Sequence, residues 1–476
     1  MAAFNRREFL ASTSALGFAS SLGLLGSLTA SQSFAADTTG YKALVCVFLF
    51  GGMDHADTII PFDQSSYNQL RSARSGLFNA YNSGNANSSR NRGNLLNLSP
   101  INSSALGGRQ YALPPQLAPL RTIFNDEDLA IVGSVGPLIQ PTTRAQIDNN
   151  SVPLPARLFS HNDQQSTWQS LGTEGQVFGW GGRFLDTIIG ADPNLNSRFA
   201  AITASSNSVF LSGQNIQPAS IASGNAPRVN AINSRSIIGS GSGFDPARQR
   251  LFDYLRRSDL GQGNAFARDL STLQAEGVAA GDDFANALNS ASLNTNFPST
   301  SLGQQLNSVA NAISVRNTVE LTGTNRQVFF VGIGGFDSHS DQTATLPGLH
   351  TEIANAVSSF RQAMIELGVW NDVTLFTASD FGRTLPDNGD GTDHGWAGHH
   401  FVAGGAVRGQ RIFGNLPSSD ASTNEYTRSR GRLIPTVSVE QYAATLGRWF
   451  GLNDSELDAA LPNLANFSTR DLGFMS

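Results

Sequence analysis

Four short, almost uninterrupted apolar segments constrain the fold of this chain more than any other feature. They are Ala43–Phe50 (ALVCVFLF), Leu129–Val135, Gln327–Ile333 and Asp372–Ala378. Strands that are apolar on both faces are typical of a parallel sheet that helices cover on both sides. The sequence therefore predicts an α/β fold with a mostly parallel central sheet.

Helical periodicity marks three stretches between and after these segments. In Leu349–Leu367, apolar residues recur at steps of three and four, which predicts a helix that joins the last two strands. A second helix is predicted over Leu302–Val315, and a third after Ser438, because Ser438 and Gln441 match a capping box. A strand, a helix and a strand in this order form a βαβ unit, which supports parallel strands.

Two stretches rich in Asn, Ser and Gly lack any apolar period. They lie near residues 81–112 and 205–245, and we interpret them as surface insertions. We find no internal repeat of fixed period. A single α/β domain over residues 37–476 therefore fits the order of elements better than two domains do.

The first 36 residues have the pattern of an export signal. Arg6 and Arg7 precede Phe9 and a weakly hydrophobic Gly/Ser/Ala/Leu stretch, and small residues mark a cleavage region at Ser33–Ala36. The leader resembles the twin-arginine type, which implies export by the twin-arginine translocation machinery to the bacterial periplasm or the medium. A retained membrane anchor is the alternative, although the many Ser, Thr and Gly residues make this stretch a poor permanent span.

Charge and residue usage exclude several classes of function. The formal net charge is -6, so no basic surface excess is available for binding nucleic acid. Lys42 is the only lysine, so a P-loop phosphate site cannot form. The single cysteine, Cys46, lies inside the first apolar segment and is expected to be a core residue rather than a catalytic thiol or a zinc ligand.

Acidic residues and histidines gather where the predicted strands end. Asp54 follows the first strand, Asp337 and His339 follow the third, and Asp380 and then His394 follow the fourth. Loops at the carboxyl ends of parallel strands lie on one edge of a sheet, so we expect these loops to converge. Carboxylates combined with imidazoles suit zinc, manganese or iron. Each residue alone could equally be a helix cap or a hydrogen-bonded structural group, but their concentration favours a site.

The order of these motifs resembles a known family. The leader, FSHNDQQSTWQSLG, GGFDSHSDQ, SDFGRT and GTDHG together resemble a large exported bacterial family of unknown function within the alkaline phosphatase and sulfatase superfamily. The resemblance covers nearly the whole mature chain. It implies a three-layer α/β/α sandwich around a mixed, mostly parallel sheet, and a metal-assisted site related to the hydrolysis of phosphate and sulfate esters.

The resemblance also implies a set of metal ligands. One or two divalent ions are expected, zinc first, with manganese, iron or calcium as alternatives. Two positions depart from the superfamily pattern: Phe381 stands where a further histidine is expected, and GGMDHAD differs from the usual first ligand loop. For the last ligand, His394 competes with His399 and His400. The implied ligands are Asp54, Asp337, His339, Asp380 and His394.

Three further residues receive catalytic roles from the resemblance. Ser160 is expected at a helix N-terminus, where it would be the nucleophile, a helix cap or both. His161 is an acid-base partner or a metal ligand. Arg383 would hold the anionic oxygens of the substrate, or alternatively form a salt bridge or a helix cap.

The leading interpretation is an exported metal-dependent hydrolase that acts on small phosphate or related sulfate and phosphodiester esters. A sulfatase with a formylglycine nucleophile is not expected, because no Cys/Ser-x-Pro-x-Arg signature is present. The alternative is a catalytically degenerate exported protein that binds a ligand or assembles on the cell surface, since fold alone does not establish activity. A phosphomutase or another transferase is a third, weaker interpretation.

Overall fold

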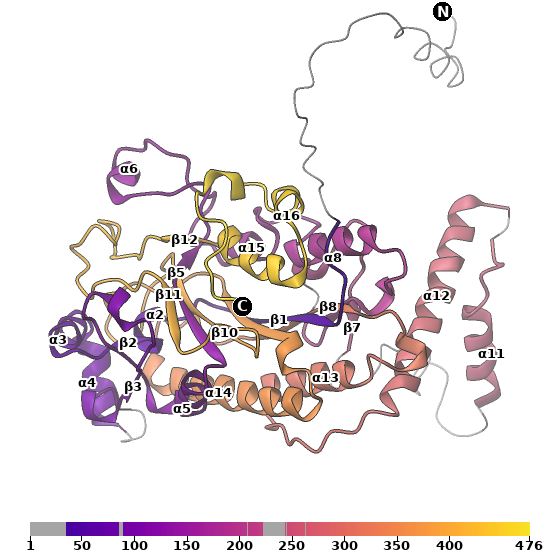
Figure 1. Ribbon diagram of the computed structural model, residues 1–476, viewed down its shortest axis with the longest axis horizontal. Helices are drawn as coiled ribbons and strands as arrows, with labels where there is room; N and C mark the ends of the chain where they lie inside the picture. Colours follow the sequence, from indigo (N-terminus) through magenta and orange to yellow (C-terminus); the bar gives the residue numbers. More distant parts are fainter. Residues whose placement is uncertain (1–34, 85–88, 207, 222–242, 244, 262) are drawn as a thin grey trace, which may run out of the picture. The chain divides into compact units, whose positions relative to one another are not determined.

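The computed structural model describes residues 35–84, 89–206, 208–221, 243, 245–261 and 263–476, so the twin-arginine motif and nearly all of the predicted signal lie outside the described residues. The centre of the domain is a nine-stranded sheet (Figure 1). Its order is β11-β5-β10-β9-β1-β8-β6-β7, and β12 also pairs with β5. The strands are β1 (Lys42–Leu49), β5 (Leu129–Gly136), β6 (Ala201–Thr203), β7 (Ala219–Ser220), β8 (Arg326–Ile333), β9 (Val373–Ser379), β10 (Gly398–Ala403), β11 (Arg411–Gly414) and β12 (Val437–Ser438).

The sheet is parallel except around one strand. β1 pairs in parallel with both β8 and β9, so that Val45 lies opposite Phe329 on one side and Leu375 on the other. β10 runs antiparallel to β5 and to β9. The four apolar segments of the sequence are β5 and the three central strands β8, β1 and β9, and each prediction is correct to within one residue at either end. The predicted mostly parallel sheet is therefore confirmed.

Helices cover both faces of the sheet, as strands without a polar face require. Val45 and Val47 of β1 belong to a core shared with helices α5, α13 and α14, whereas Leu44 and Cys46 belong to a second core shared with α8, α15 and α16. The three-layer sandwich and the core position of Cys46 are confirmed. These helices are α5 (Ala118–Asn125), α8 (Trp180–Ala191), α13 (Ser301–Ser314), α14 (Gln342–Glu366), α15 (Val439–Phe450) and α16 (Asp454–Ala460).

The three predicted helices are present, and one is longer than expected. α13 and α15 match their predictions, and the capping box of α15 is complete, with the Ser438 hydroxyl accepting from the Gln441 N–H at 2.9 Å. α14 begins at Gln342 rather than Leu349. Pro347 is the sixth residue of the helix, and a proline inside a helical pattern usually marks a helix boundary, so the turns before Leu349 were not predicted.

The two Asn/Ser/Gly-rich stretches contain more order than a surface loop. Strands β3 (Leu96–Asn97) and β4 (Tyr111–Leu113) lie in or at the end of the first stretch, and β4 pairs with both β3 and β2 (Ile60–Pro61) in a small second sheet. In the second stretch, residues 222–242 and 244 lie outside the described residues, while Phe210 is buried.

The remaining α-helices were not predicted individually. Within the described part of the chain, no helix combines the length and the apolar character that a membrane crossing requires. These helices are α2 (His55–Thr58), α3 (Gln64–Ala73), α4 (Ser75–Ser83), α6 (Arg144–Asp148), α7 (His161–Ser170), α11 (Asp245–Leu255) and α12 (Ala265–Leu288).

Candidate functional site

The candidate site lies where loops after β8 and β9 meet the N-terminus of α7. Asp337 and His339 follow β8, Asp380 follows β9, and His394 lies in the loop between β9 and β10. His161 is the first residue of α7. Contacts join all five residues, which is the convergence that strand-end loops of a parallel sheet produce.

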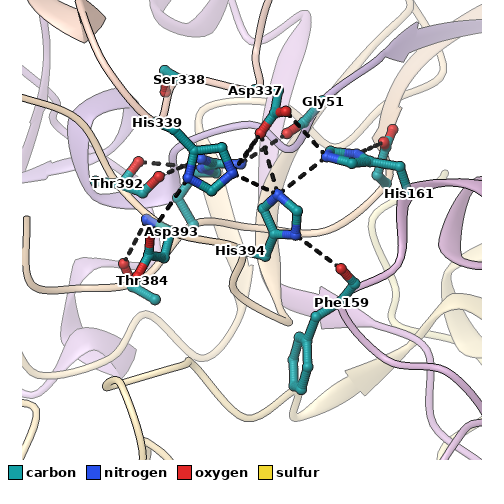
Figure 2. Close-up of polar contacts among 12 residues, drawn as sticks. Gly51, Phe159, His161, Asp337, Ser338, His339, Thr384, Thr392, Asp393 and His394 are labelled. Carbon is teal, nitrogen blue, oxygen red and sulfur yellow. Dashed lines mark hydrogen bonds and ion pairs between the residues drawn. The ribbon is translucent and has the colours of Figure 1, made fainter. Parts of the chain in front are cut away.

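A group of three side chains could hold a metal ion. The ligand atoms of His161, Asp337 and His394 all lie within 4.8 Å of one another. His394 Nε2 is 3.1 Å from His161 Nε2 and 3.2 Å from Asp337 Oδ1, and His161 Nε2 is 3.3 Å from Asp337 Oδ2. Figure 2 shows these side chains pointing toward one another. Two imidazole nitrogens and a carboxylate are the donors of many zinc sites.

His339 lies at the edge of this group. Its Nε2 is 2.8 Å from His394 Nε2 and 3.2 Å from Asp337 Oδ1. Its side chain is 47% exposed and that of Asp337 is 46% exposed, so an ion can reach the group from solvent. His339 could therefore supply a fourth donor atom.

The other ring nitrogen of each histidine faces an acceptor (Figure 2). His161 Nδ1 is 2.6 Å from Asp380 Oδ2, and His394 Nδ1 is 2.8 Å from the carbonyl oxygen of Phe159. His339 Nδ1 is 3.4 Å from an oxygen of Asp393. A proton on Nδ1 satisfies each of these contacts and leaves the Nε2 lone pairs directed at one another and at a carboxylate. A positive charge between these lone pairs, either a metal ion or a proton on one Nε2, would satisfy this arrangement.

Arg383 holds Asp337 in place. Its Nη1 donates to Asp337 Oδ1 at 2.9 Å and to the Gly51 carbonyl at 3.1 Å, and its Nη2 donates to the Thr392 carbonyl. The residue has no exposed surface. Burial raises the pKa of Asp337, but the hydrogen bond and charge of Arg383 outweigh it and keep the pKa below its ordinary value. Arg383 thus contacts a carboxylate of the site and no open surface.

Asp380 holds His161 in place. Its Oδ2 accepts from His161 Nδ1 and, at 2.9 Å, from Gln165 Nε2. The residue is fully buried, and among the described residues its Oδ1 has no hydrogen-bond partner. The hydrogen bond to Asp380 raises the pKa of His161, whereas burial lowers that of His394. Asp380 therefore contacts the metal group through the outer ring nitrogen of His161.

Phe381 packs against two histidines of the group. Its ring centroid lies 4.8 Å from that of His161 and 4.7 Å from that of His394, and the side chain is buried. Gly52 has a φ of +97°, and a Cβ there would lie 2.7 Å from the Phe381 ring. The phenylalanine therefore fills its space tightly and offers no ligand atom.

Asp54 does not join the metal group. Arg74 donates to both of its oxygens, at 2.5 and 2.8 Å, and Gln342 Nε2 donates to Oδ2 at 2.6 Å. Burial raises the pKa of Asp54, but Arg74 outweighs this effect and lowers it to about 2. The ligand role predicted for Asp54 stays a prediction, and in this geometry its carboxylate is paired with a guanidinium group.

Ser160 is the N-cap of α7, as expected, but its hydroxyl does not cap the helix. Instead the hydroxyl donates to Asp163 Oδ2 at 2.9 Å. The first N–H groups of α7 therefore receive no cap from this side chain and lie next to His161. An uncapped helix N-terminus favours an anion.

The competing histidines are buried away from this group. His399 Nδ1 accepts from the Ser134 N–H at 3.0 Å, and His400 Nδ1 is 3.2 Å from the Thr377 hydroxyl. Both lie in β10, with at most 2% of the residue exposed. Their contacts are those of core residues.

Four residues that shape the site were not predicted. Gln165 lies four residues after His161, so helical spacing placed it on the same face and could have indicated it. Asp163 follows Ser160 by three residues, a spacing typical of helix N-termini. Arg74 and Gln342 are distant in sequence from Asp54, and nothing in the local pattern indicates their contact with it.

Three buried histidines make the fold sensitive to acid. Burial lowers the pKa from the ordinary 6.5 to about 4 for His55 and to about 3 for His350 and His400. Below about pH 6.5 the unfolded chain binds protons that the folded chain does not bind, so the free energy of unfolding falls by about 1.4 kcal/mol per pH unit for each histidine as the pH is lowered.

We expect the free energy of unfolding, measured with urea between pH 6.5 and 4, to fall less steeply in His400→Phe than in the wild type. Equal slopes would contradict this account of His400.

Comparison with known proteins gives a family and distant structural likenesses. A family model described as "Protein of unknown function (DUF1501)" matches residues 41–460. No curated protein matches the chain. The lipoteichoic acid synthase LtaP from Listeria monocytogenes is 9% identical, with 87% of this chain and 72% of that chain covered and a TM-score of 0.31. The alkaline phosphatase from the Antarctic bacterium TAB5 is also 9% identical, with 77% and 91% covered and a TM-score of 0.23.

Proposed function

Since the chain belongs to the DUF1501 family of proteins of unknown function, we propose its activity from the site: an exported metal-dependent hydrolase of phosphate or related sulfate and phosphodiester esters. One observation carries this proposal. The Nε2 atoms of His161 and His394 converge with Asp337, while each Nδ1 is turned outward to an acceptor. This is the arrangement of a metal centre whose histidines are oriented by outer hydrogen bonds.

The residues present fit a divalent ion. In this proposal His161, Asp337 and His394 bind the ion, and His339 adds a fourth donor. Nitrogen and carboxylate donors in this ratio favour zinc, with manganese and iron next. Asp380 acts on the ion through His161.

The chain's own residues supply the rest of the reaction. A bound divalent ion polarises an ester oxygen and lowers the pKa of a nearby hydroxyl or water. The uncapped N-terminus of α7 receives the anionic oxygens of the substrate. The Ser160 hydroxyl is the proposed nucleophile: its oxygen bonds to phosphorus or sulfur, its proton passes to Asp163, and the bond to the ester oxygen breaks as that oxygen takes a proton from water and leaves as the alcohol. A second water then attacks the ester on Ser160, releases the phosphate or sulfate and restores the hydroxyl. Arg383 orients Asp337 and does not contact the substrate.

Export remains part of the proposal. The single domain over residues 37–476 would be the exported part, moved by the twin-arginine machinery to the periplasm or the medium. Fractionation of host cells that produce the full chain tests this location, and retention in the cytoplasm would contradict it.

Turnover and metal content test the activity together. The purified protein is expected to contain a divalent metal and to hydrolyse at least one of 4-nitrophenyl phosphate, bis(4-nitrophenyl) phosphate and 4-nitrophenyl sulfate. Ser160→Ala should abolish turnover and keep the metal, because Ser160 contacts Asp163 and no metal ligand. Ser83→Ala, at the exposed end of α4, is the control and should behave as the wild type. Wild-type turnover in Ser160→Ala would exclude the serine nucleophile.

Two contacts favour the second candidate function, a binding or surface-assembly protein that has no catalytic activity. Asp54 is paired with Arg74, and Phe381 packs where it offers the site no donor atom. A protein that holds its metal but hydrolyses none of the three ester classes would support this candidate over the hydrolase.

A further inference from the structure

We infer that this site holds one metal ion rather than two, because Arg74 already neutralises Asp54 and Phe381 fills the space that a second ion would need. The inference rests on the proposed metal centre and deepens it by fixing the number of ions. Among the described residues, the ligand atoms of His161, Asp337 and His394 lie within 4.8 Å of one another, and His339 adjoins the same group at 2.8 Å from His394 and 3.2 Å from Asp337.

Asp54, in the loop after β1, has a carboxylate whose two oxygens already accept hydrogen bonds. Both of its oxygens are taken: Arg74 donates to each, and Gln342 and the Ala56 N–H donate one bond apiece. Arg74 is itself buried, and its other N–H groups donate to the carbonyl oxygens of Leu385 and Thr384. A guanidinium group that donates to four acceptor atoms is a permanent cation in this place, and a metal ion would have to expel it.

A second observation concerns Asp380 and its neighbour. Asp380 Oδ2 accepts from His161 and Gln165, and Oδ1 is the oxygen of this carboxylate that has no partner in the described part of the chain. A zinc ion in a protein needs three or four protein ligands, so one oxygen cannot hold it. The next residue, Phe381, places its ring within 4.8 Å of the His161 ring and contributes no donor. The side of the site next to Asp380 therefore lacks the ligands for a second ion.

A third observation is the balance of charge. Asp54 is paired with Arg74 and Asp337 with Arg383, whereas Asp380 contacts His161 and Gln165, so these five charged groups carry one net negative charge. One divalent ion brings the group to one net positive charge, whereas two would bring it to three. Both arginines are buried, so solvent cannot screen the additional repulsion.

Counting zinc in the wild-type protein tests the inference directly. The metal-free full chain is titrated with zinc against a chromophoric chelator, and the zinc that stays bound through gel filtration is measured. We expect one zinc per chain. Two tightly bound zinc ions per chain would overturn the inference.

The Asp380→Asn variant tests whether Asp380 positions His161 or binds the ion itself. If Asp380 acts through His161, the variant keeps one zinc with an affinity lower by about 10- to 100-fold, the range for outer-shell partners of a ligand. The absorption spectrum of its cobalt form should show an unchanged coordination number. A change in coordination number would overturn the inference, because it would make Asp380 a ligand. Asp253→Asn, exposed on α11, is the matched control.

Failure of the ion count and failure of the proposed function are distinguishable. Two zinc ions with ester turnover overturn the count alone. One zinc without turnover supports the count and overturns the hydrolase. A chain that binds no zinc overturns both.

Discussion

Replacing Arg74 with methionine is expected to lower the free energy of unfolding by about 3–5 kcal/mol, the usual loss when one partner of a buried ion pair is removed. The carboxylate of Asp54 has 1% of its surface exposed and would be left without a counter-charge. Arg74 also donates to the carbonyl oxygens of Thr384 and Leu385, which would lose their partners. Urea unfolding at pH 7 measures the change.

Arg71→Met is the matched control for this variant. Arg71 is exposed in the last turn of α3, three residues before Arg74, so the same substitution should change stability by less than about 0.5 kcal/mol. Asp54→Asn in the Arg74→Met background should recover part of the loss, because a neutral amide is less costly to bury than a carboxylate. If Arg74→Met and Arg71→Met lost stability equally, the Asp54–Arg74 pair would not support the site.

The second large effect is expected for His394→Ala, which should weaken zinc binding by more than about 100-fold, beyond the loss typical of an outer-shell partner. His394 Nε2 lies within 3.2 Å of ligand atoms on His161, Asp337 and His339, so it is central to the group. Chelator competition measures the affinity. His339→Ala should weaken binding less, because His339 lies at the edge.

The folding of His394→Ala can be checked independently of the metal. His394 has contacts to the Phe159 carbonyl and to the ligand side chains, and it is only half-buried. The thermal midpoint of the metal-free variant should therefore remain near that of the metal-free wild type. Unchanged zinc affinity in a folded His394→Ala would remove this histidine from the proposed centre.

The central strands could be predicted from sequence because each consists of consecutive apolar residues, which indicate burial on both faces. A run such as ALVCVFLF has no polar face, so it fits only between two helical layers. The strands β3 and β4 escaped prediction because they have only two and three residues, and tertiary pairing holds them. The long helix α12 was not predicted because its large apolar residues Phe266, Leu270 and Leu273 are exposed, which blurs the apolar period.

The site was predictable in outline for a topological reason. Asp337, His339 and Asp380 follow parallel strands, whose carboxyl ends meet at one edge of the sheet. What the sequence does not specify is which acids face the ion and which face an arginine. Asp54 and Asp337 both follow Gly-Gly turns, yet both oxygens of Asp54 face Arg74, whereas Asp337 contacts the histidines and Arg383. That difference depends on side chains brought in from distant helices and loops.

Zinc titration of the metal-free protein with turnover as the readout tests the central claim most directly. A chromogenic ester that the loaded protein hydrolyses is supplied, and the rate is measured against equivalents of zinc. The account predicts negligible hydrolysis without zinc, a linear rise, and a plateau at one equivalent per chain. Equal hydrolysis by the metal-free and the loaded protein, or no hydrolysis at any zinc concentration, would contradict it.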